Sequence, residues 1–339
     1  MRSHEQQQQP QVQQKRQNHE FIVAGYLPDY CTHVNITSAS QYLTDLILFS
    51  IQPTPKGELN QCCLKPHQIK AAQTAAAASS NNNNATNTRI WVTIGGMQRS
   101  QAFPQLLLER QHRLTFLENL LAFCKENINF LYGVNLYWDD PKTRQDLNAY
   151  SQLILDTATV LHEHGILLSL TTRQFFSKNV IDKVDFINLL AFDLIPKSAG
   201  AGPGDVQRQH QHHHHHAAME SVTMLVDNVL HQGDIPPHKL ILGIPAYARH
   251  QDDPANVRTF AELVEDGYRE LTQSSYKGYL FDSPGRVKRK VKFAKKRGLG
   301  GVFLWELGQD KQVRGAPGGM LLEAIAVGQY TTELLRDEL

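Results

Sequence analysis

The chain of 339 residues has few cysteines, no long apolar run and almost no net charge. Its four cysteines, Cys31, Cys62, Cys63 and Cys124, lack the spacing of a zinc site or a disulfide framework, and a bridge between the adjacent Cys62 and Cys63 would be strained. Because no apolar run is long enough to cross a bilayer, we expect no membrane span. A net charge of +1 gives no reason to expect a nucleic acid as partner.

The two ends of the chain give conflicting indications of its compartment. Residues 1–20 are rich in Gln and contain no apolar segment, so they predict a disordered tail and, as written, no signal peptide. Residues 336–339, Arg-Asp-Glu-Leu, differ by one residue from the Lys-Asp-Glu-Leu retention address. That ending indicates the lumen of the endoplasmic reticulum or the secretory pathway only if the amino terminus is incomplete. The compartment therefore stays undecided.

Eight short apolar runs alternate with helical segments along the chain. The runs predict buried strands at residues 21–26, 45–51, 89–96, 131–138, 166–171, 184–193, 240–247 and 300–306. Apolar spacing predicts helices at residues 66–78, 106–124, 147–164 and 218–232. This alternation is typical of a (β/α)8 TIM barrel, here a single domain over residues 21–327. Low-complexity inserts are expected at residues 79–88 and 199–217, and a C-terminal tail at residues 328–339.

The fourth run combines an apolar strand with polar residues at its end. Side chains alternate along a strand, so Asn135, Tyr137 and Asp139 are expected on one face and Trp138 on the other. A carboxylate therefore stands at the carboxyl end of a barrel strand, where the chemistry of α/β barrels is found. The alternative is a core strand whose final acids merely cap the next helix.

A histidine cluster, formed by His210 and residues 212–216, has the composition of a transition-metal site. Slippage of a low-complexity sequence explains it better, since the chain also carries Gln and Asn runs. We therefore predict no metal and no cofactor. The basic segment at residues 288–297 is interpreted as a solvated helix face.

The order of these runs resembles the family 18 glycoside hydrolases, the chitinases and chitinase-like lectins. Residues 93–96, Thr-Ile-Gly-Gly, resemble the Ser-x-Gly-Gly signature of strand three, and residues 190–193, Leu-Ala-Phe-Asp, resemble Met-x-Tyr-Asp of strand six. Residues 242–247 match the Leu-Gly-x-Pro-x-Tyr pattern of strand seven, and residues 298–307 are similar to the last βα unit. The resemblance covers residues 21–327, and we expect a monomer.

The strand-four motif departs from the family pattern. The family carries Asp-Gly-x-Asp-x-Asp-Trp-Glu, where residues 132–139 read Tyr-Gly-Val-Asn-Leu-Tyr-Trp-Asp, so all four acidic positions are changed. The resemblance implies that Asp139 stands at the position of the catalytic acid. It also places Tyr137 where an Asp orients the 2-acetamido group of the sugar, and Asn135 where a further Asp precedes it.

These changes affect a mechanism in which the acetamido group of the substrate replaces a protein nucleophile. Asp139 is one methylene shorter than Glu, roughly 1.5 Å, and a misplacement of about 1 Å can cost about 10²-fold in rate. Tyr137, with an ordinary pKa of about 10, cannot supply the charge that stabilises the intermediate. Phe192 lacks the hydroxyl that the family aims at the acetamide. Hydrolysis is therefore expected to be lost or strongly impaired.

Binding of a sugar can survive these losses. Trp305, at the end of the last strand, would form an apolar floor under a sugar ring, with Asp193, Phe192, Tyr247 and Tyr26 around it. The leading hypothesis is a lectin-like pseudoenzyme whose partner is a chitin-like oligosaccharide or polysaccharide. Residues 248–297 are too few for the extra α+β domain of deep-groove chitinases, so at most a small insertion after strand seven and a shallower cleft are expected.

Two alternatives remain open. One is an active glycoside hydrolase that uses Asp139 as the acid and Asp193 as its partner, on substrates without the 2-acetamido group. A carboxyl separation of about 5 Å would then predict retention of configuration, and one above about 6.5 Å inversion. The other is a protein-interaction scaffold whose sugar site is filled by Tyr137.

Overall fold

The structure, a computed structural model, describes residues 21–60, 64–78, 88–194, 215–312 and 319–330. Several predicted features fall outside these ranges: the tail 1–20, nearly all of the insert 79–88, residues 199–214 of the second insert with His210, Cys62 and Cys63, and the C-terminal residues 331–339. Among the described residues, no helix is both long and apolar enough to cross a membrane.

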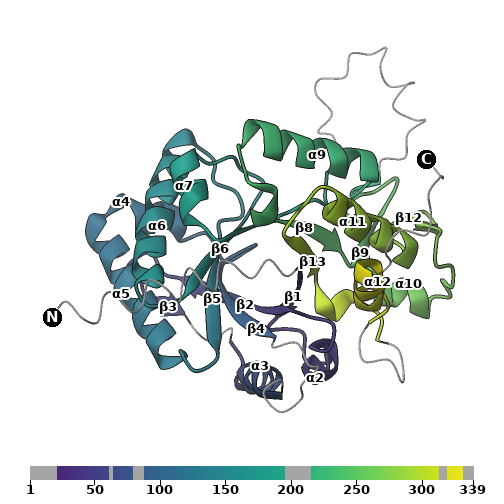
Figure 1. Cartoon of the computed structure of the whole chain (residues 1–339), viewed down its shortest axis with the longest axis horizontal. Coiled ribbons are helices and arrows are strands. Elements are labelled where there is room, and N and C mark those ends of the chain that lie inside the picture. The colour runs from purple at the N-terminus through teal and green to yellow at the C-terminus, as the bar shows by residue number, and fades with distance from the viewer. Residues whose placement is uncertain (1–20, 61–63, 79–87, 195–214, 313–318, 331–339) are drawn as a thin grey trace.

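A closed ring of eight parallel strands forms the centre of the protein (Figure 1). Its members are β1 (Ile22–Pro28), β2 (Asp45–Pro53), β4 (Arg89–Gly95), β5 (Leu131–Tyr137), β6 (Leu167–Thr172), β7 (Phe186–Leu189), β8 (Leu240–Pro245) and β13 (Gly301–Trp305). Each strand pairs with its neighbour, and the pairing of β1 with β2 closes the barrel. The predicted (β/α)8 barrel is therefore confirmed. One short strand, β3 (Leu59–Asn60), extends β2 as an antiparallel hairpin.

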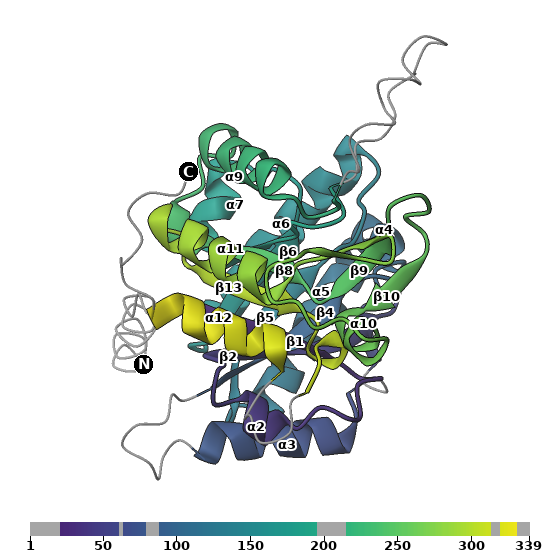
Figure 2. The same ribbon diagram turned by 90° about the vertical axis from the view of Figure 1, so that its right-hand side faces the viewer.

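Helices surround the ring (Figures 1 and 2). They are α2 (Ile36–Ala39), α3 (Pro66–Ala78), α4 (Phe103–Leu108), α5 (Arg110–Glu126), α6 (Arg144–His162), α7 (Lys178–Lys183), α9 (Met219–Gln232), α11 (Pro284–Lys296) and α12 (Met320–Tyr330). The helix predicted at residues 106–124 is instead two helices, because Glu109 between them has an extended backbone.

Two features of the observed elements bear on the site. The strand predicted at residues 184–193 ends at Leu189, so Asp193 lies in the following segment, with a positive φ of 56°. After β8 the chain forms a small antiparallel sheet. It consists of β9 (Tyr247–His250), β10 (Val257–Thr259), β11 (Ser275–Tyr276) and β12 (Tyr279–Leu280), with the short helix α10 (Phe260–Glu265). This is the small insertion expected after strand seven.

Buried apolar residues form one cluster between strands and helices and a second cluster inside the barrel. Trp138 belongs to the first: its ring stacks on Phe103 at 5.4 Å and meets the edge of Tyr150. At the amino end of the strands, the Asp45 carboxylate pairs with the Arg89 guanidinium and accepts a 2.6 Å hydrogen bond from the Trp91 indole. The polar residues that end β5 therefore lie at the opposite, carboxyl end, which is free to carry a site.

Candidate functional site

Asn135 lies at the centre of a neutral hydrogen-bond network inside the barrel. Its Oδ1 accepts hydrogen bonds from the hydroxyls of Thr171 at 3.0 Å and Thr93 at 3.2 Å. Its Nδ2 donates to the Ser169 hydroxyl at 2.9 Å. The Tyr26 hydroxyl is 2.6 Å from Thr171 and extends the network to β1. Because Asn135 is an amide and these partners are all hydroxyls, the inner position of the strand-four motif has neither a carboxyl proton nor a charge.

Tyr137 and Asp139 are brought together by the end of β5. Tyr137 is 5% exposed, and its hydroxyl donates a 2.9 Å hydrogen bond to Oδ1 of Asp139. Burial and the nearby Asp139 carboxylate raise the pKa of Tyr137 well above its usual value, so the phenol stays neutral. Asp139 itself is exposed, and its backbone N–H donates to the Ser100 hydroxyl at 3.1 Å. One carboxyl oxygen of Asp139 is thus engaged by the Tyr137 hydroxyl.

Aromatic side chains fill the carboxyl end of the barrel interior. The Trp305 ring is 5.0 Å from Phe49 and 5.1 Å from Tyr26, and Phe49 is 6.4 Å from Tyr137. Gly96 permits this packing: its φ is 103°, and a Cβ there would lie 2.3 Å from the Phe49 ring. Only 7% of Trp305 is exposed, so most of the indole surface is covered by protein.

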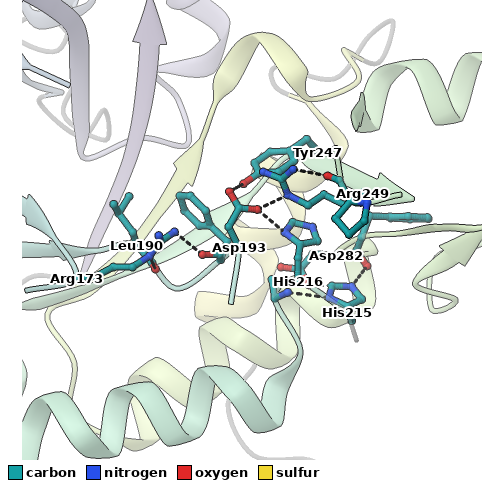
Figure 3. Close-up of polar contacts among 12 residues, drawn as sticks. Arg173, Leu190, Asp193, His215, His216, Tyr247, Arg249 and Asp282 are labelled. Carbon is teal, nitrogen blue, oxygen red and sulfur yellow. Dashed lines mark hydrogen bonds and ion pairs between the residues drawn. The ribbon is translucent and has the colours of Figure 1, made fainter. Parts of the chain in front are cut away.

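A second polar centre surrounds Asp193 (Figure 3). Its carboxylate accepts hydrogen bonds from the Tyr247 hydroxyl at 2.8 Å, from Nε of Arg249 at 2.5 Å and from Nδ1 of His216 at 3.1 Å. Burial on its own would raise the pKa of Asp193, but these three donors hold it well below the usual range. Asp193 is therefore an ionised carboxylate, and it is only partly exposed.

His216 and its neighbour His215 connect this centre to Phe281, which lies just before α11. The two rings stack at 5.4 Å, with an angle of 4° between their planes. Nε2 of His215 donates to the carbonyl oxygen of Phe281 at 2.6 Å, and Nδ1 accepts from the N–H of Ala217 at 3.0 Å. Both rings are buried. The last residues of the histidine run therefore pack inside the protein, next to Asp193.

Phe192 faces the same centre but contributes only its ring. It is 6.1 Å from Tyr247 and 6.3 Å from Phe303, and it is 5% exposed. The Arg173 guanidinium lies 6.0 Å from this ring and donates to the carbonyl oxygens of Leu190 and Phe192. Arg173 thereby fixes the segment that follows β7 (Figure 3).

Sequence reasoning named Asp193 and Tyr247 but missed Arg249 and His216. A signal for Arg249 existed, because residues two apart on a strand share a face and Tyr247 begins β9. No local pattern marks His216, since it is one of several consecutive histidines. The structure describes no group of three or more His, Cys, Asp or Glu side chains that could hold a metal ion.

The closed barrel and the polar residues at its carboxyl end have the architecture of glycoside-hydrolase barrels. Residues 5–310 match the family described as "Glycosyl hydrolases family 18". The chain therefore belongs to this family.

Curated relatives are distant. Chitinase 1 of Aphanocladium album is 22% identical over 277 residues, covering 67% of this chain and 63% of the relative. Chitotriosidase-1 of Mus musculus is 25% identical over 264 residues, covering 62% of this chain and 56% of the relative. The chain thus spans less than two thirds of the length of these relatives.

Solved structures share the fold. A chitinase from Bacteroides thetaiotaomicron superposes with a TM-score of 0.73 at 15% identity, covering 93% of this chain and 99% of the other. The chitinase ChiB of Flavobacterium johnsoniae gives a TM-score of 0.70 at 23% identity, covering 91% and 94%. A Cycas revoluta chitinase mutant in complex with (GlcNAc)4 gives 0.70 at 18%, covering 91% and 99%.

Proposed function

We propose that this family 18 barrel recognises chitin-type oligosaccharides and hydrolyses them poorly or not at all. The observation that carries the proposal is the hydrogen bond from Tyr137 to Asp139. A general acid must deliver a proton to the leaving oxygen, and a second group must stabilise the positive charge that develops on the acetamido group. Here a neutral phenol occupies the second position, and it also binds the carboxyl at the first.

The rest of the strand-four motif supports the same conclusion. Asn135 carries an amide, engaged by hydroxyl partners, so it can neither accept nor release a proton for its neighbour. Phe192 presents no hydroxyl toward the acetamide. Several interactions that stabilise one developing charge are absent together, and such groups contribute as a unit.

Recognition of the glycan is supported by the family and by the polar centre at Asp193. A solved relative from Cycas revoluta, with the same fold, is in complex with (GlcNAc)4. In this chain, Asp193 is held ionised and partly exposed, and hydroxyl groups of a sugar are suitable donors to its carboxylate. The same three donors weaken the alternative in which Asp193 partners Asp139 in hydrolysis, because they occupy the Asp193 carboxylate oxygens and make them poorer as a base or nucleophile.

A second candidate function, a non-catalytic interaction scaffold, is favoured by the aromatic cluster. Tyr137 is 5% exposed and Trp305 is 7% exposed, so a ring that should lie under a sugar is mostly covered. In that case the barrel would present its outer surfaces to a protein partner.

One experiment tests both candidates. The full chain and Asp139→Ala are incubated with chitin oligosaccharides; binding is measured by calorimetry and products by mass spectrometry after long incubation. Binding without products supports the proposal. Complete and rapid conversion to products, lost in Asp139→Ala, would overturn it and make Asp139 an efficient acid. Neither binding nor products would favour the scaffold.

A further inference from the structure

Helix α11 concentrates positive charge on the outer wall of the barrel. Residues 286–297 contain eight Lys or Arg and no Asp or Glu, although the whole chain has a net charge of only +1. The helix lies between α9 and α12 (Figure 2). It contributes nothing to the polar centres around Asp139 and Asp193, so its charge needs a separate explanation.

Three of the eight cations are held by partners on neighbouring elements. Lys290 is fully buried and pairs with Asp282. Arg297 pairs with Asp227 of α9, and Lys295 donates to a backbone carbonyl oxygen of α12. These contacts fix the two sides of α11 that face its neighbours. They account for the inner and flanking cations by packing alone.

The outward side of α11 carries four further cations, which we call the basic stripe: Lys288, Arg289, Lys292 and Lys296. Because residues three and four apart lie on one helix face, the stripe follows the helix axis over roughly 12 Å. Three of its members are exposed, and Lys288 is half-buried. Within the described ranges of the chain, none of the four side chains has a hydrogen bond or an ion pair.

The basic stripe is unfavourable for the helix that carries it. Lysines 288, 292 and 296 follow one another at intervals of four residues, and like charges at that spacing repel and destabilise a helix. The helix dipole favours cations in the last turn, which accounts for Lys296 but not for Arg289 or Lys292. Proteins break such local rules mainly at functional sites. The stripe therefore points to an anionic partner.

Exposed apolar side chains lie beside the basic stripe. Met224 is exposed and shares a face of α9 with Asp227, which pairs with Arg297 of α11. Leu271 is also exposed, and its carbonyl oxygen accepts a hydrogen bond from the Gly285 N–H in the first turn of α11. Cations together with exposed apolar side chains are typical of surfaces that lie on the headgroup region of a bilayer.

We infer that the basic stripe docks the protein on an anionic lipid surface. The apolar face of α11 is buried against the barrel, so the helix stays on the protein and the attraction is electrostatic. Each Lys or Arg near such a surface strengthens binding roughly fivefold. Met224 and Leu271 add apolar contact with the headgroup region. The inference goes beyond the proposed function and does not depend on it, because the two use different residues.

A single-stranded nucleic acid is the other polyanion that a line of cations attracts. Such ligands are usually held by aromatic side chains on which bases stack. Phe293 is the aromatic residue of α11, and the Arg297 guanidinium lies over its ring at 5.3 Å. The ring is therefore already covered, and a lipid surface fits the stripe better.

Vesicle co-sedimentation of the full chain tests the inference. Wild type should bind vesicles that contain about 30% phosphatidylserine in phosphatidylcholine, and should not bind vesicles of phosphatidylcholine alone. Raising NaCl from about 0.05 M to about 0.5 M should release it, because salt screens the charges. The triple variant Arg289→Gln, Lys292→Gln and Lys296→Gln should bind the phosphatidylserine vesicles about 100-fold more weakly, and Lys292→Gln alone about fivefold more weakly.

Two control variants separate the stripe from net charge and from side-chain identity. The first removes one Arg and two Lys from exposed positions on α3, α5 and α6, as Lys70→Gln, Lys125→Gln and Arg144→Gln. The second keeps every charge of the stripe, as Arg289→Lys, Lys292→Arg and Lys296→Arg. Both should bind phosphatidylserine vesicles like wild type. Urea unfolding should show that all variants are folded.

Several results would overturn the inference. Wild type that ignores phosphatidylserine, or a stripe variant that binds like wild type, would leave the stripe without a role at lipid. Equal losses in the stripe variant and the scattered control would assign binding to net charge. Binding of polyuridylate through the stripe, without binding to phosphatidylserine vesicles, would assign it to a nucleic acid. Chitin oligosaccharides should bind wild type and the stripe variant equally, so failure of the proposed function is seen separately.

Discussion

The hydroxyl of Tyr137 donates a 2.9 Å hydrogen bond to Oδ1 of Asp139, so two residues that would have separate catalytic duties are bound to each other. The pair links the end of a buried strand to an exposed carboxyl. Around this pair, Asn135 at the inner position of the motif is uncharged. The aromatic rings of Phe49 and Trp305 pack against each other. Under the proposed function, loss of one catalytic group would leave a slow enzyme, whereas this arrangement would impair the acid, its partner and the charge stabilisation together.

The first prediction concerns restoration of activity. Asp139→Glu alone should give no measurable hydrolysis of chitin oligosaccharides, because Tyr137 still occupies the assisting position. The combined variant Asn135→Asp, Tyr137→Asp, Asp139→Glu and Phe192→Tyr should give products, since groups that act on one charge contribute as a unit. Mass spectrometry of the products checks this. If Asp139→Glu were as active as the combined variant, the groups would act independently and the prediction would be wrong.

The second prediction concerns Asn135. Asn135→Asp places a carboxyl among neutral partners in the barrel interior, where burial raises its pKa above the value in the unfolded chain. The folded state then holds the proton more tightly, so stability relative to wild type falls as pH rises above about 4. We expect the free energy of unfolding of Asn135→Asp to be close to that of wild type at pH 4 and lower by about 1–3 kcal/mol at pH 7.

Urea unfolding at the two pH values measures this loss. Asn228→Asp, on the exposed surface of α9, is the matched control and should show almost no pH dependence relative to wild type. An Asn135→Asp variant that is equally stable at both pH values would mean that the hydroxyl network stabilises the charged form.

The third prediction tests whether Trp305 supports a bound sugar ring or is only a core residue. Because its ring is covered by Phe49 and Tyr26, Trp305→Ala should lower the free energy of unfolding by about 3–5 kcal/mol. Trp91→Ala, at the other end of the barrel, should cost a similar amount. The milder Trp305→Phe should fold and, if Trp305 is only a core residue, should bind chitin oligosaccharide like wild type. A large loss of affinity in Trp305→Phe alone would assign the platform role to Trp305.

The architecture was predictable because it depends on a repeated local signal. Each barrel strand lies in a predominantly apolar segment of the sequence, and eight such segments separated by helical spacing have few other solutions. Glu109 was not predictable from periodicity, because apolar spacing continues through it while its backbone is extended. The end of β7 was missed for a related reason: residues 190–192 are buried without being paired as a strand.

The site was only partly predictable. Alternation along a strand places Tyr137 and Asp139 on one side, so their contact follows from the sequence. The donors to Asp193 come from segments distant in the chain, and their convergence depends on the positive φ of Asp193 and on the path after β8. Composition also misleads at His215 and His216, because a run of histidines resembles a low-complexity segment whether or not its last members are buried.

The fourth prediction follows from His215. Burial is the main reason that the pKa of His215 is lowered to about 3, and its two hydrogen bonds require a neutral ring, because Nδ1 accepts while Nε2 donates. Asp282, 3.9 Å away, opposes the shift, whereas Arg286 and His216 add to it. Between pH 3 and 6.5 the unfolded chain binds a proton that the folded chain does not. Stability should therefore fall on acidification through this window, by up to about 1.4 kcal/mol for each pH unit.

His215→Gln removes the titrating ring while leaving an amide that can donate and accept. Urea unfolding at pH 7.0, 5.5 and 4.5, chosen to sample about two units of the window, should give a flatter profile for this variant than for wild type. His231→Gln, which changes an exposed histidine on α9, should keep the wild-type slope. The comparison of slopes isolates the contribution of one buried ring, because wild type and His215→Gln differ in no other titrating group and His231→Gln controls for the loss of an exposed histidine. Parallel profiles for wild type and His215→Gln would show that the buried ring accepts a proton without loss of stability.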